Sequence, residues 1–244
     1  MALRRIRAKA QAQDSENENY FISMTDIMVG MTFMFIIMLM FFAIKLERIA
    51  AQGAEVIKSF TTTEEIRAKI LKEIKDDMAR KGFMVQIYPD KGVLRLPESI
   101  LFDKGKANLL SRGKESIGVL GQSLYNNLLC YTSYVPDRTA RSCPEALHSV
   151  EAVLIEGHTD SDGSDFANWN LSIQRSFTAY QFMIESNPAL AGLANKNNEA
   201  ILSISGYGSQ RPVEPNNTED NKRNNRRVDI RIIMIPPKSS GMRM

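Results

Sequence analysis

A single carboxylate, Asp26, lies inside the most apolar part of this 244-residue chain. It is the only charge between Phe21 and Ile44, a segment rich in Met, Phe and Ile. A carboxylate in hydrocarbon is costly, so it usually faces a helix bundle or a water-filled path and marks a route for protons or ions. A capping or snorkelling acid at a helix end is the alternative interpretation. On the first interpretation, Gly30 lies one turn later on the same face and would allow close approach of another helix.

The uncharged run Ile27–Ile44 has the length of a membrane span. As a helix it would extend roughly 27 Å, close to the thickness of a bilayer core. A cleaved signal peptide would have a shorter apolar run followed by small residues, whereas Lys45 and Glu47 follow this one. We therefore expect an uncleaved transmembrane helix over residues 20–45, in contact with the lipid bilayer.

Charges around this segment predict its orientation. The short N-terminal arm is basic, with Arg4, Arg5, Arg7 and Lys9. By the positive-inside rule the N-terminus is cytoplasmic. The protein is then a single-pass protein of a bacterial inner membrane, with a periplasmic C-terminal part. The net charge of +3 is mild and the basic residues are scattered, so we expect no nucleic-acid partner.

Cysteine usage agrees with export. The chain has two cysteines, Cys130 and Cys143, in one loop-like region between Asn127 and Ser149. An even pair in an exported domain predicts a disulfide, and two unrelated thiols are the alternative.

Composition predicts five parts along the chain. Residues 1–19 form a polar cytoplasmic arm and residues 20–45 the transmembrane helix. Residues 46–82 form a periplasmic helical linker, with a break and restart near Thr61-Thr62-Thr63 because a threonine there can cap a new helix. Residues 83–236 form a globular domain, and residues 237–244 a flexible tail.

The globular part reads as strand, strand, helix, strand, helix, strand, strand. Apolar runs predict strands near 83–88, 93–96, 150–155, 200–205 and 227–235, and helices near 107–126 and 168–185. The turn residues Asp90-Lys91-Gly92 lie between the first two strands and predict that these strands form a hairpin. This order predicts an α+β fold, a mixed sheet with helices on one face.

One polar loop between a strand and a helix carries a set of motifs. The loop and helix contain Glu156-Gly157-His158-Thr159-Asp160, Asn168, Leu171-Ser172 and Arg175; Phe102-Asp103 precedes, and Gly206-Tyr207-Gly208 and Asn225-Arg226-Arg227 follow. In this order and spacing they resemble the signature of OmpA-like peptidoglycan-binding domains, from about Phe83 to Ile235. The Cys130–Cys143 insertion is not general to that family.

That resemblance implies a ligand and a site. The ligand would be the diaminopimelate stem peptide of peptidoglycan, whose free end carries an ammonium and a carboxylate on one carbon. The resemblance assigns Asp160 to the ammonium and Arg175 to the carboxylate, which the planar guanidinium can bind bidentately. Asn168, Thr159 and Leu171 are further contacts, and Arg226 lines the rim or pairs with an acidic neighbour. Trp169 and Tyr207 either contact glycan or pack.

The residues that a metal site or an enzyme active site would need are missing from the sequence. His158 with Asp160, Asp162 and Asp165 could suggest a metal, but a closing bidentate Glu and further His or Cys ligands are missing. With only two histidines in the chain, no nucleophile or acid–base pair is convincing. We expect no enzyme activity, no metal and no cofactor.

The membrane segment and the domain together resemble MotB-type stator subunits, and more closely the ZorB-type subunits of Zorya anti-phage systems. This resemblance implies a dimer of the chain inside a ring of polytopic MotA-like or ZorA-like subunits. Ions, with protons favoured, would pass by way of Asp26 and drive mechanical work against the wall. The alternatives are a flagellar-type stator subunit, a passive wall-binding tether and an energy transducer of the ExbD/TolR type.

Overall fold

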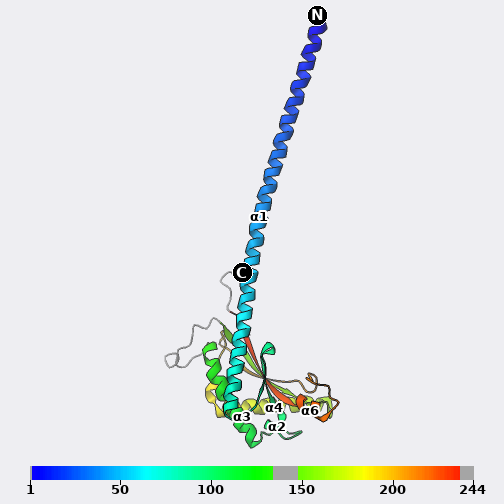
Figure 1. Ribbon diagram of the computed structural model, residues 1–244. Coiled ribbons are helices and arrows are strands. Elements are labelled where there is room, and N and C mark those ends of the chain that lie inside the picture. The colour runs from blue at the N-terminus through cyan, green and yellow to red at the C-terminus, as the bar shows by residue number, and fades with distance from the viewer. Residues whose placement is uncertain (1, 134–147, 237–244) are drawn as a thin grey trace. The chain divides into compact units, whose positions relative to one another are not determined.

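The computed structural model describes residues 2–133 and 148–236, with side chains described from Met24 onward. The chain divides into two compact units, Met1–Val56 and Ile57–Met244, and each is a body of its own. Helix α1 begins at Ala2 and ends at Arg80, so it contributes residues to both units (Figure 1).

The N-terminal unit contains a long apolar helical segment. Between Ile27 and Ile44 the large apolar side chains are 46–74% exposed on every side of α1. A helix that is apolar all round is either buried in a large core or lies in a membrane. Among the described residues, α1 is the one helix long and apolar enough to span a bilayer.

The expected helix break near Thr61 is wrong, because α1 continues through it. The hydroxyls of Thr61, Thr62 and Thr63 donate to carbonyls four residues earlier, at 3.0, 2.9 and 2.7 Å. A hydroxyl that bonds back to the preceding turn is satisfied inside a helix and does not cap a new one.

The C-terminal unit is built on a five-stranded mixed sheet of order β1-β2-β5-β3-β4. Strands β3 and β4 pair in parallel, and the other pairs are antiparallel. The strands are β1 (Gln86–Tyr88), β2 (Val93–Pro97), β3 (Ser149–His158), β4 (Leu202–Gly206) and β5 (Arg227–Ile235). The expected hairpin is β1–β2, closed by Gly92 with φ 66°. The α+β class is confirmed.

Helices complete this unit. They are α2 (Glu98–Leu101), α3 (Ser111–Leu128), α4 (Asp165–Ser186), α5 (Pro188–Ala191) and α6 (Glu219–Asn225), with short 3-10 turns η1 (Pro89–Lys91) and η2 (Leu129–Tyr131). Helix α4 packs on β3 and β4, and α3 packs on α4. A loop was expected from 127 to 149, but α3 and η2 continue to Tyr131, so the loop begins later. Residues 134–147 lie outside the described part.

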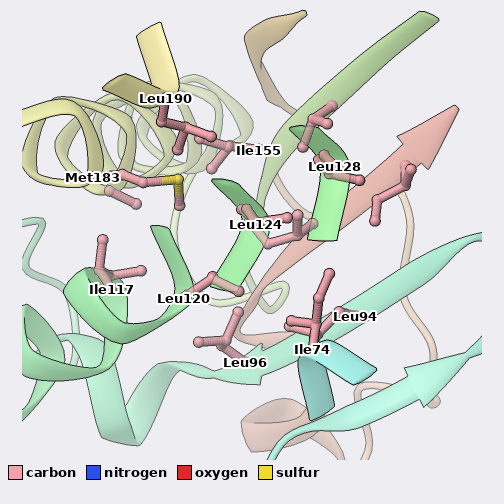
Figure 2. Packing of buried hydrophobic residues seen from close by; sticks show 14 of the residues in the cluster. Ile74, Leu94, Leu96, Ile117, Leu120, Leu124, Leu128, Ile155, Met183 and Leu190 are labelled. Carbon is pink, nitrogen blue, oxygen red and sulfur yellow. The ribbon is translucent and has the colours of Figure 1, made fainter. Parts of the chain in front are cut away.

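The end of α1 belongs to the hydrophobic core. Its residues Ile70, Leu71, Ile74 and Met78 are 0–1% exposed. They recur at helical spacing, so they form one apolar face of the helix. Figure 2 shows Ile74 among core residues that come from β2 and α3. The second half of the expected linker is thus part of the globular unit.

Two glycines bring the sheet against α4. A Cβ at Gly157 in β3 would collide with the backbone carbonyl of Ser172, and one at Gly206 in β4 would collide with Ile173. The parallel strands β3 and β4 can therefore lie close to the middle of α4. This contact places the loop after β3 beside the helix that carries the candidate ligand-binding residues.

Candidate ligand-binding site at the end of strand β3

Asp160 lies two residues beyond the end of β3 and is 4% exposed. Its Oδ1 accepts the backbone N–H of Asp162 at 3.0 Å. Its Oδ2 accepts from Arg226 at 2.5 Å, in a buried ion pair. The carboxylate expected to bind an ammonium is thus already compensated by a cation from the end of α6.

Arg175 lies on the inner face of α4 and is 1% exposed. Its Nε donates to the carbonyl of Lys106 at 2.9 Å, and its guanidinium forms an ion pair with Glu98. The guanidinium also lies 5.3 Å from the centre of the Phe102 ring. Burial lowers the pKa of Arg175, and the charge of Glu98 acts in the opposite direction.

Glu98 joins the two arginines. One of its carboxylate oxygens accepts from Arg175, and the other accepts from Arg226 Nε at 2.5 Å. Burial by itself lowers the pKa of Arg226, but the hydrogen bonds to Asp160 and Glu98 outweigh it and raise that pKa. Asp160 and Arg175 are therefore not paired directly, and a chain of ion pairs through Arg226 and Glu98 links them.

Sequence reasoning missed Glu98. The available signal was an acid two residues before the apolar run Ile100-Leu101-Phe102, a place where a charge needs a partner. Arg226 was expected at the rim or in an ion pair, and the ion pair is what the structure contains.

The neutral residues of the predicted site lie around this chain of charges. Thr159 is 3% exposed, and its hydroxyl oxygen has no hydrogen-bond partner in the part of the chain that the structure describes. Asn168 is buried and donates to the carbonyl of Asp162 at 3.0 Å, which ties α4 to the loop. Leu171 is half-buried on α4.

Exposed ion pairs surround the buried charges. Glu219 accepts from Arg226 at 3.1 Å and from Lys104 at 3.3 Å, and its side chain is 54% exposed. Lys222 bonds Asp162 at 2.5 Å. The hydrogen bond from Lys104 lowers the pKa of Glu219. These pairs are accessible to solvent and contribute little to stability.

A second group of charges lies on the sheet face opposite α4. Glu156, His158 and Asp229 place ligand atoms within 4.8 Å of one another. Each carboxylate already holds arginines: Asp229 bonds Arg95 at 2.8 and 2.9 Å and Arg227 at 2.9 Å, and Glu156 bonds Arg231 at 2.8 Å through both oxygens. A cation here would have to displace those arginines, so the donor set does not fit a metal.

His158 is 2% exposed and neutral. Burial, then the charge of Arg227, lowers its pKa to about 3. Its ring stacks on the ring of Tyr207, with centroids 5.2 Å apart. The guanidinium of Arg211 lies 3.8 Å from the centre of the same Tyr207 ring. Of the two roles considered for Tyr207, packing is the one that these contacts support.

Comparisons with known proteins agree with the fold. Residues 138–226 match the model of the OmpA family. This part of the C-terminal unit is similar to that family. The chain is 28% identical over 174 residues to motility protein B of Bacillus subtilis, covering 70% of this chain and 56% of that protein. It is 36% identical over 83 residues to a peptidoglycan-associated lipoprotein of Buchnera aphidicola, covering 34% of this chain and 43% of that one. The chain thus spans about half the length of these relatives.

A solved structure of a MotB-like protein from Desulfovibrio vulgaris is 20% identical, with a TM-score of 0.49, and covers 70% of this chain and 95% of that one. The similarity to the OmpA family covers residues 138–226, and the ZorB-type resemblance stays a prediction. The pairing of Cys130 with Cys143 also stays a prediction, because Cys143 lies outside the described residues.

Proposed function

We propose that this protein is the wall-anchoring, MotB-like subunit of an ion-driven motor in a bacterial inner membrane. The observation that carries the proposal is one chain with two features. An acid, Asp26, stands in a helix that is apolar on all sides, and an OmpA-like domain holds buried acids and arginines at the end of β3. An intramembrane ionisable residue suggests an ion route, and the domain suggests a fixed anchor.

The anchor is proposed to be peptidoglycan, through the free end of its diaminopimelate stem peptide. Asp160 would receive the ammonium and Arg175 the carboxylate, with Thr159 and Asn168 beside them. The unpartnered hydroxyl of the buried Thr159 supports a polar ligand at this position, because such groups are normally paired. Both charged residues now have protein partners, so binding would share or exchange those ion pairs.

The test of wall binding is sedimentation of the full chain with purified peptidoglycan. We expect Asp160→Ala and Arg175→Ala to reduce binding at least about tenfold, since a hydrogen bond to a charged group contributes on the order of 1.5–3 kcal/mol. The exposed Asp90 and Arg112 provide matched controls, Asp90→Ala and Arg112→Ala, which should bind like the unchanged chain. If all four variants bind peptidoglycan as strongly as the unchanged chain, the proposed site is wrong.

The motor role is proposed to depend on Asp26. Two copies would lie inside a ring of polytopic MotA-like subunits, with Asp26 alternating between ionised and neutral forms as protons pass. We expect Asp26→Asn to abolish ion flux through the reconstituted complex without loss of the partner on co-purification. Glu47→Gln, which removes an acid just beyond the apolar run of the same helix, is the control and should keep activity.

The work is proposed to serve anti-phage defence, as the ZorB-type resemblance of the sequence implies. Phage plating on cells with the Asp26→Asn variant tests this: defence should be lost. Motility that depends on Asp26, with no effect on plating, would favour the flagellar-type subunit. A chain that is active with Asn at position 26, and that recovers no multi-pass partner, would be a passive tether.

A further inference from the structure

Four buried charges in the candidate site form an alternating series. In order they are Asp160, Arg226, Glu98 and Arg175, and they are 4, 7, 5 and 1% exposed. Each neighbouring pair in the series is an ion pair. Two acids and two arginines cancel, so the buried part of the site carries no net charge.

The fifth charge that touches the series does not change this balance. Glu219 bonds Arg226, but its side chain is 54% exposed and it also bonds Lys104. Solvent and Lys104 therefore screen Glu219, whereas water does not screen Glu98. Among the acids that the structure describes near the two arginines, Glu98 is the one that contacts both.

A neutral buried site discriminates by the net charge of what enters it. A ligand group with one net charge loses its hydration when it enters the site. The neutral cluster has no excess opposite charge to compensate that loss. A zwitterion brings both signs: its carboxylate can share Arg175 with Glu98 while its ammonium takes Asp160. A simple carboxylate competes with Glu98 for Arg175 and leaves an excess negative charge.

We propose that Glu98 is the specificity-determining residue of this site, because it neutralises the two arginines so that a zwitterionic end is bound and a simple carboxylate is rejected. This inference rests on the proposed wall-binding function, whose ligand has such an end. Glu98 acts from within the domain by holding Arg175 and Arg226, without needing contact with the ligand.

The experiment compares two ligands that differ in one group. One is a stem tripeptide ending in diaminopimelate with its free amine, and the other is the same peptide acetylated on that amine. Binding of both to the full chain in detergent is measured by calorimetry. The unchanged chain should prefer the free amine by at least about tenfold, since one unit charge is left uncompensated in the alternative.

Glu98→Gln keeps the shape of the side chain and gives the site a net positive charge. We expect this variant to bind the acetylated peptide about tenfold more tightly than the unchanged chain does, with a smaller change for the free amine. Glu219→Gln is the matched control, because it also contacts Arg226 but is exposed, and it should change neither affinity by more than about threefold.

Each outcome decides something. If the folded Glu98→Gln variant binds the acetylated peptide no more tightly, the role of Glu98 is overturned while wall binding stands. If the unchanged chain binds neither peptide, wall binding fails and this inference falls with it. If Glu98→Gln does not fold, the unchanged chain still gives a result, because equal affinity for the two peptides would overturn the proposal.

Discussion

At the scale of single residues, the charges of the domain have two different surroundings. Asp160, Arg175, Glu98 and Arg226 meet at the loop after β3, where a buried hydroxyl still has no partner among the described residues. On the opposite face, the carboxylates of Glu156 and Asp229 are held by arginines through both oxygens. The carboxylates of both groups are compensated by arginines, and each group keeps a buried polar side chain without a partner among the described residues, the Thr159 hydroxyl in the first and the His158 ring in the second.

His158 predicts a pH dependence of stability. Its pKa is about 3 in the folded chain and near 6.5 when exposed, so below pH 6.5 the unfolded chain binds more protons. The free energy of unfolding is therefore unaffected by the protonation of His158 above pH 6.5, and it decreases as the pH falls from 6.5 toward 3. From pH 7 to pH 5 the loss should be about 1–2 kcal/mol.

Denaturant unfolding of the full chain at pH 7 and pH 5 measures this loss, with His158→Gln as the comparison. The variant should be less stable at pH 7, because it loses the stacking on Tyr207, yet it should show a smaller decrease toward pH 5. Equal decreases in both proteins would show that other groups cause the pH dependence. The charged groups around the ring are Glu156, Asp229, Arg95, Arg211 and Arg227.

At the scale of elements, apolar spacing predicted most of the sheet and helices. Strand β5 has the expected bounds, and the hairpin of β1 and β2 follows from its turn residues. The break expected in α1 failed because threonine capping and threonine back-bonding have the same local sequence, and packing decides between them. That decision depends on partners such as His148, 85 residues away, which bonds the Thr63 hydroxyl at 2.9 Å.

The candidate site was predictable only in part, for a similar reason. The types and order of Asp160, Asn168 and Arg175 indicated a polar site on a strand-to-helix loop, and the structure brings them to one place. The partner of each charge was not predictable, because Glu98 and Arg226 are far apart in sequence and meet only when β2 pairs with β5. Long-range pairing, not local pattern, determines how the charges are compensated.

The close contact of β3 with α4 predicts that adding one methyl group at Gly157 lowers stability. Gly157→Ala places a Cβ against the backbone of Ser172, which cannot move without shifting the helix. We expect a loss of about 2–3 kcal/mol or more in stability, and weaker peptidoglycan binding because Arg175 lies on the same helix. Thermal unfolding and sedimentation with peptidoglycan measure the two effects.

Gly118→Ala is the matched control. Gly118 lies in α3, where a Cβ would meet Ser186 at an ordinary 3.8 Å. Alanine in a helix interior is favoured over glycine by about 1 kcal/mol, so this variant should be slightly more stable and bind normally. A Gly157→Ala variant as stable as the unchanged chain would mean that β3 and α4 are not in tight contact.

At the scale of the whole molecule, the structure relocates the boundary between linker and domain. The expected domain began at residue 83, but the compact C-terminal unit begins at Ile57. Buried residues of α1, including Ile70 and Ile74, lie between these two points. Helix α1, which carries the apolar segment, is therefore also a core element of the C-terminal unit, and its last turns are not a spacer.

This predicts where the chain can be shortened. A fragment of residues 57–244 should fold, whereas a fragment of residues 83–244 lacks Ile70, Leu71, Ile74 and Met78 and exposes the core that they cover. Each such side chain contributes about 1.5–3 kcal/mol on burial, so their joint loss is comparable with the total stability of about 5–15 kcal/mol of a domain. Size-exclusion chromatography and thermal unfolding compare the two fragments.

Substitution within the longer fragment separates packing from length. Ile74→Ala should lower the stability of fragment 57–244 by about 2–5 kcal/mol, because it leaves a cavity in the core. Glu64→Ala, an exposed position on the same helix, should change little. If fragment 83–244 unfolds at the same temperature as fragment 57–244, α1 contributes nothing to the domain. The helix would then be the separate linker that the sequence alone predicts.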